Sequence, residues 1–197
     1  MNKIIKSLCI STVICIIFSM IPFNVQCKNL SNDVFRLHIL ANSDSEKDQA
    51  LKLKVRNATL KYTEKLYKNS KSKSEAEALT SKNLQSIADI AKKEIVKNGC
   101  DYSVKAEIKH MYFNTRYYGK VTMPSGFYNA LRITIGKGEG HNWWCVMYPS
   151  LCVGASTDYN SLKENTSEQE YDVMTNEKYE FKFKAVEYFE KICSFFS

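Results

Sequence analysis

The hydrophobic period of the chain changes from helix-like to strand-like near residue 99, and this change constrains the fold more than any other feature. In two stretches before it, 45–68 and 74–98, apolar residues recur every three or four positions, as in amphipathic helices. After it, apolar and polar residues alternate, as in half-buried strands, and a similar alternation occupies residues 32–40. The order strand, two helices, three strands predicts an α+β fold with a mostly antiparallel sheet of about four strands.

Capping residues mark the ends of the two expected helices. Ser45 and Ser74 each begin a capping-box pattern, with an acidic residue three positions later. Asn98-Gly99 ends the second helix, with glycine where a left-handed cap is needed. Because only the short polar stretch 69–73 separates them, the two helices are expected to pack on the sheet as an antiparallel hairpin.

A glycine-rich stretch lies between the last two expected strands, 128–135 and 141–148. Gly136, Gly138 and Gly140 alternate there, which invites comparison with phosphate-binding loops. Such loops are followed by a helix whose N-terminus faces the phosphate. Here strand-like sequence stands on both sides, so the glycines predict a hairpin turn and no nucleotide cofactor.

The first 27 residues have the organisation of a secretion signal. Lys3 and Lys6 precede a charge-free run over residues 8–21, Pro22 follows, and a polar region starts after Cys27. This order predicts a signal peptide over residues 1–27 and a secreted mature chain. Two alternatives stay open, an uncleaved membrane anchor and a lipid-modified Cys27, although a spanning helix needs about 20 apolar residues.

The rest of the chain divides into a main domain and a tail. We expect an α+β domain at 28–155, a polar linker or loop at 156–176, and an amphipathic helix at 177–197. This helix is expected to dock on the sheet, with a membrane-surface position as the alternative. The net charge of +7 is mild and scattered, which favours acidic partners or an anionic membrane surface and argues against nucleic acid.

Four of the seven cysteines lie beyond the expected leader: Cys100, Cys145, Cys152 and Cys193. An even set in an exported chain permits disulfides. A Cys145–Cys152 bond closes a loop of eight residues, and it would stabilise the fold by about 2.5 kcal/mol on a chain-entropy estimate. Pairing of these two with Cys100 and Cys193 stays open. No Cys-x-x-Cys spacing occurs and only three histidines are present, so no metal site is expected.

Cys145 is also the most tempting nucleophile, with His141 as its base. Residues four apart on a strand share a face but lie about 13 Å apart. A base must lie within about 3 Å of the proton that it takes. We therefore expect no enzymatic activity and no catalytic residue. Two alternatives stay open. One is a secreted thiol or cell-wall hydrolase that uses Cys145, with His38 or His110 reaching it from another strand as the base, and the other is a purely structural wall-associated module.

The two tryptophans, Trp143 and Trp144, are adjacent on the last expected strand and therefore point to opposite faces. At most one of them is expected in the core, which leaves the other exposed or half-exposed. A surface tryptophan near arginine and tyrosine is typical of a binding hot spot. This pattern favours an interaction protein.

Two segments carry a longer pattern. The first runs from Arg36 to Arg56 and contains Arg-Leu-His-Ile-Leu-Ala-Asn-Ser-Asp-Ser, and the second runs from Pro124 to Cys152 and contains Asn-Trp-Trp-Cys. Together they resemble the stage II sporulation protein R family over residues 34–152. The resemblance implies a signal that is made in the forespore and exported into the space between forespore and mother cell. There it would trigger a membrane-embedded aspartic protease, which cleaves the precursor of the early mother-cell sigma factor.

These two segments supply the candidate contact residues, although the resemblance itself assigns none. In the first segment we expect one polar cluster where the first strand enters the first helix: Arg36, His38, Asn42, Asp44 and Arg56. In the second segment we expect three residues to form or border the partner-binding surface: Asn142, Trp143 and Trp144. The hypothesis requires the two segments to converge in the folded chain.

Overall fold

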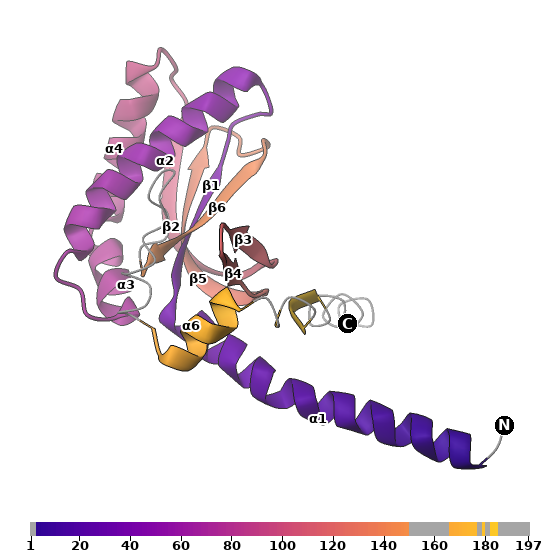
Figure 1. Ribbon diagram of the computed structural model, residues 1–197. Helices are drawn as coiled ribbons and strands as arrows, with labels where there is room; N and C mark the ends of the chain where they lie inside the picture. Colours follow the sequence, from indigo (N-terminus) through magenta and orange to yellow (C-terminus); the bar gives the residue numbers. More distant parts are fainter. Residues whose placement is uncertain (1–2, 150–165, 177–178, 180–181, 185–197) are drawn as a thin grey trace.

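A computed structural model of the chain describes residues 3–149, 166–176, 179 and 182–184, and it confirms the α+β fold (Figure 1). The helices in chain order are α1 (Lys3–Asp33), α2 (Glu46–Tyr67), α3 (Lys73–Lys82), α4 (Leu84–Lys97) and α6 (Glu168–Thr175). The strands are β1 (Phe35–Leu40), β2 (Val104–Phe113), β3 (Arg116–Tyr118), β4 (Val121–Met123), β5 (Gly126–Ile135) and β6 (Asn142–Tyr148). A main sheet is built from four of these strands, and β3 and β4 form a separate hairpin.

The main sheet has the order β2-β5-β1-β6, with β1 parallel to β5 and antiparallel to β6. The first strand of the sheet therefore lies between the last two. The hairpin expected at the glycine-rich stretch is wrong, because residues 136–141 cross over the end of β1 to reach β6 on its other side. The burial of β1 explains this order. Five of its six residues are buried, so a central position gives it hydrogen-bonded neighbours on both edges.

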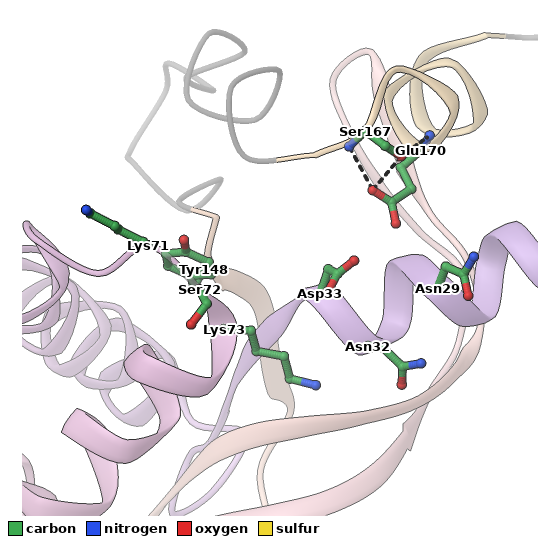
Figure 2. A pocket seen from close by; sticks show the side chains of 9 residues that line it. All are labelled: Asn29, Asn32, Asp33, Lys71, Ser72, Lys73, Tyr148, Ser167 and Glu170. Atoms are coloured by element: carbon green, nitrogen blue, oxygen red, sulfur yellow. Dashed lines mark hydrogen bonds between the residues drawn. The ribbon is translucent and has the colours of Figure 1, made fainter.

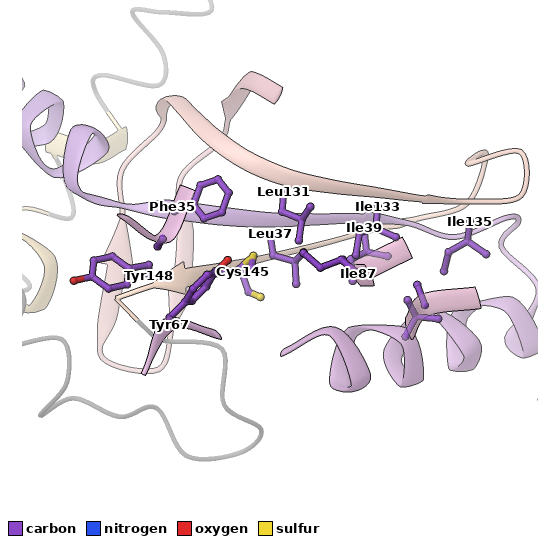
Figure 3. Packing of buried hydrophobic residues seen from close by; sticks show 14 of the residues in the cluster. Phe35, Leu37, Ile39, Tyr67, Ile87, Leu131, Ile133, Ile135, Cys145 and Tyr148 are labelled. Atoms are coloured by element: carbon purple, nitrogen blue, oxygen red, sulfur yellow. The ribbon is translucent and has the colours of Figure 1, made fainter. Parts of the chain in front are cut away.

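One face of the sheet packs against α2, α3 and α4 (Figure 3). Alternate residues of β1 and β5, including Leu37, Ile39 and Leu131, meet Ile87 of α4 there. The expected second helix is in fact two helices, because Asn83 ends α3 and precedes α4. The cap of α3 is also earlier than expected: Ser72, not Ser74, accepts the backbone N–H of Glu75.

The other face of the sheet is covered by α1, α6 and the β3–β4 hairpin (Figure 1). Leu30 and Val34 of the α1 end pack there with Tyr128 of β5 and Met174 of α6. The α1 helix is continuous through Pro22, so the leader boundary expected at residue 27 falls inside a helix whose Phe23 and Leu30 are buried. Among the helices that the structure describes, none has the length and apolarity to cross a membrane.

The α6 helix lies inside the stretch that we expected to be a polar linker, 156–176. That expectation is wrong for residues 168–175, because Ser167 and Glu170 form a complete capping box. The acidic composition conceals two apolar residues, Val173 and Met174, which are buried against α1 and the hairpin. Most of the helix expected at 177–197 lies outside the described residues and stays a prediction.

Candidate functional site

The glycine-rich connection packs directly on the residues that follow β1. The backbone N–H of Gly140 donates to Ala41 O at 3.0 Å, and that of Lys137 donates to Asn42 Oδ1 at 3.1 Å. A Cβ atom on Gly140 would overlap the carbonyl of Ser43. The glycines therefore serve a close approach between two chain segments.

The first turn of α2 fixes the segment on which the glycines pack. The carboxylate of Asp48 accepts hydrogen bonds from Asn42 Nδ2 at 2.9 Å and Ser43 Oγ at 2.6 Å. Burial alone would raise the pKa of Asp48, but the hydrogen bonds from Ser43 and Asn42 outweigh it and lower the pKa. Asn42 thus bonds to α2 through its amide nitrogen and to the glycine-rich connection through its oxygen.

Asp44 holds the other end of the connection. Its Oδ1 atom accepts the backbone N–H of His141 at 2.6 Å and also faces the ring Nδ1 of His141. These backbone and side-chain hydrogen bonds lower the pKa of the exposed Asp44 carboxyl. The buried Lys52 donates to His141 O at 2.9 Å, and burial lowers its pKa. Two segments almost a hundred residues apart are therefore joined at one end of the sheet.

The two tryptophans point to opposite faces of β6, as their alternation predicts. Trp143 packs on the helix side, where the Arg56 guanidinium lies 4.3 Å from its ring centroid. Trp144 packs on the other side, stacked on His38 with ring centroids 3.9 Å apart. Both tryptophans are half-buried. The eight predicted contact residues are therefore split between two faces and do not form one continuous surface.

Arg36 and His38 lie inside the protein, which corrects their expected place at a surface. Arg36 is 0% exposed, and its guanidinium lies 4.1 Å from the Phe113 ring centroid and donates to Tyr118 Oη at 2.9 Å. His38 is 3% exposed. Burial, and secondly the charge of Arg132, lowers the pKa of His38 to about 4, although the nearby Asn142 side chain opposes this shift. Aromatic rings from distant strands cover both side chains, which the local sequence does not reveal.

An open depression of about 600 Å³ lies where the two segments meet. Its lining consists of Asp44, Asn114, Arg116, Glu139, Gly140, His141, Asn142 and Trp144. Three of these were among the predicted contact residues: Asp44, Asn142 and Trp144. Arg116 was missed because its β3 strand joins the site only through the tertiary fold, and its guanidinium lies 5.6 Å from the Trp144 ring centroid.

A second depression, also of about 600 Å³, lies at the junction of α1, α3 and α6 (Figure 2). Asp33 and Glu170 face each other there. Partial burial, and then the neighbouring Glu170, raises the pKa of Asp33, while Lys73 opposes this shift. In the described part of the chain, no group of three or more His, Cys, Asp or Glu residues could hold a metal ion.

Cys145 faces the helix-side core and is 1% exposed. Cys15 and Cys100 take part in no disulfide. No bond joins two of the cysteines described, and Cys152 lies outside that part of the chain, so the Cys145–Cys152 pairing stays a prediction. A cysteine buried in apolar surroundings is a poor nucleophile, and the ring of His141 is engaged by Asp44. Both observations disfavour the alternative of a hydrolase that uses Cys145.

Comparison with known proteins identifies the relatives of the chain. The family described as Stage II sporulation protein R (spore_II_R) matches residues 31–158. The chain belongs to this family. Its match covers both segments that converge at the depression, and it confirms the resemblance seen in the sequence. The family takes its name from a protein of stage II of sporulation.

Stage II sporulation protein R of Bacillus subtilis (strain 168) is 36% identical to the chain over 140 residues. The match covers 71% of this chain and 62% of that relative, so the chain spans less than two thirds of the relative's length. No solved protein structure matches the chain.

Proposed function

We propose that this chain is a secreted signal that binds and activates a membrane-embedded aspartic protease during sporulation. It acts in the space between forespore and mother cell, and the protease then cleaves the precursor of the early mother-cell sigma factor. Family membership supports the sporulation role. The alternating polar and aromatic residues at one end of the sheet support recognition of a protein partner.

The convergence of the two sequence segments carries the proposal. They are far apart in the chain, yet Asn42, Asp44 and Lys52 bond to the backbone of residues 137 and 141. This arrangement leaves His141 and Asn142 exposed beside the half-buried Trp144. We place the protease contact at this depression. His38 stacks on Trp144, and the buried Arg36 packs on Phe113, which contacts the same tryptophan. Arg56 and Trp143 lie outside the depression on the helix side.

A bulky charged residue at the rim tests this position. Asn142→Arg changes an exposed side chain, so the fold is expected to persist while the partner is kept away. We expect cleavage of the sigma-factor precursor to fall at least about tenfold, which is the size of effect that loss of a central interface contact produces. The measurement is an immunoblot of the precursor in sporulating cells whose own copy of this gene is replaced by the variant.

The matched control is Ser86→Arg, which adds the same side chain at an exposed position of α4, on the opposite face of the sheet. It should leave precursor cleavage unchanged. If Asn142→Arg accumulates normally and supports full cleavage, the depression is not the contact. If cells without this gene cleave the precursor at the normal rate, the proposed function itself is wrong.

A further inference from the structure

Arg116 is the one basic side chain in the lining of the depression whose charge meets no carboxylate within the described ranges. It comes from β3, and its guanidinium lies over Trp144 at 5.6 Å from the ring centroid. Its Nε atom is buried and has no hydrogen-bond partner among the residues described. Planar guanidinium groups bind carboxylates through two parallel hydrogen bonds, so this side chain has an unused capacity for an anion.

The protein beneath Trp144 adds further uncompensated positive charge. Arg36 is fully buried, and its Nε and Nη1 atoms have no hydrogen-bond partner in the described structure. Tyr118 is its hydrogen-bond acceptor, and the rings of Phe113 and Tyr128 are its neighbours. A buried charge is normally paired with an opposite one. Because no carboxylate pairs with Arg36 within the ranges described, its charge makes the electrostatic potential positive behind the Trp144 ring that lines the depression.

The acidic residues near the depression do not cancel this charge. Asp44 accepts two hydrogen bonds from His141, and Glu139 is exposed to solvent. Glu107 lies across from Arg132 on the neighbouring strand and forms an ion pair with Lys105. The carboxylates at the rim are therefore engaged or solvated, while Arg116 and Arg36 stay without a counter-charge in the described chain.

We infer that the protease segment bound at this depression is acidic, and that Arg116 binds one of its carboxylates beside the Trp144 ring. The inference rests on the proposed function and names the chemistry of the partner at the same site. His38 and Phe113 hold Trp144 in place through a stacked contact at 3.9 Å and an edge contact at 4.7 Å between ring centroids. Arginine and tryptophan are both enriched in interface hot spots.

The test is direct binding between the purified chain and the detergent-solubilised protease of the same bacterium. We expect Arg116→Gln to raise the Kd at least about tenfold, Arg116→Glu to raise it further, and Arg116→Lys to keep part of the affinity. Wild-type binding should weaken with added salt, and Arg116→Gln should show a weaker salt dependence. A thermal unfolding curve for each variant separates loss of contact from loss of fold.

The control for net charge is Lys93→Gln, which removes one positive charge from an exposed position of α4 on the other side of the sheet. It should change the Kd less than about twofold, because surface charges more than a Debye length away are screened. If Arg116→Gln binds as tightly as wild type while Asn142→Arg does not bind, the acidic-segment inference is overturned and the proposed function stands. If the wild-type chain does not bind the protease at all, both are overturned.

Discussion

At the scale of single residues, burial separates supporting side chains from contacting ones. The alternation of β1 placed Arg36 and His38 correctly on one face of the strand, but it predicted a half-exposed face. Both are buried because Phe113 and Trp144 arrive from other strands and cover them. The local sequence could not predict this, since the covering rings lie about 75 and 105 residues downstream.

His38 should make the stability of the fold depend on pH. Its pKa in the folded protein is about 4, below the ordinary value of 6.5. As the pH falls from 6.5 towards 4, His38 of the unfolded chain binds a proton before His38 of the folded protein does. Acidification therefore lowers the free energy of unfolding. From pH 7 to pH 4.5 the loss from this group should be about 2 kcal/mol. The measurement is guanidinium unfolding of wild type and His38→Phe at both pH values.

The phenylalanine variant keeps an aromatic ring against Trp144 but cannot be protonated. Acidic residues titrate in the same range in both proteins, so the difference between the two proteins isolates His38. We expect the wild type to lose more stability on acidification than the variant. If both proteins lose the same stability, then protonation of His38 at pH 4.5 does not destabilise the folded protein. That result would contradict the burial of His38 away from water that the structure shows.

At the scale of elements, the glycine-rich connection is the feature that joins the two halves of the site. Gly140→Ala should lower the free energy of unfolding by about 3 kcal/mol, because the added methyl group overlaps the Ser43 carbonyl and forces the backbone apart. The measurement is chemical denaturation of the purified variant.

Gly99→Ala is the matched control. Gly99 has φ +71°, but no atom lies within 4 Å of an added Cβ. Its substitution should cost only the conformational penalty of about 1 kcal/mol. A smaller loss for Gly140→Ala than for Gly99→Ala would mean that the connection does not pack tightly on the end of β1.

The same elements show what the sequence could and could not predict. Periodicity and capping located α2, the end of α4 and every strand of the main sheet, because these signals are local. Pairing order is not local, so the insertion of β1 between β5 and β6 was missed. The break at Asn83 was missed because the apolar stripe continues across it. The α6 helix was missed because its capping box lies in an acidic stretch with only a short apolar face.

At the scale of the whole molecule, the fold has two functionally different ends. The α1 helix reaches the sheet at the start of β1, and its first residues extend away from the body with Ile4, Leu8 and Phe18 exposed (Figure 1). The glycine-rich connection and the depression lie at the other end of β1. The candidate site was predicted in part. Asn142 and Trp144 line it, while Arg116 came to it only through the tertiary fold.

Contact between the protease and the depression at the end of β1 is tested most directly by crosslinking. A photoreactive benzoylphenylalanine is placed at residue 142 in one variant and at residue 86 in another, and both are irradiated in sporulating cells. The rim position should give a covalent adduct with the membrane-embedded protease, and the α4 position should give none. An adduct from residue 86 but not from residue 142, in variants that both support precursor cleavage, would contradict contact at the depression.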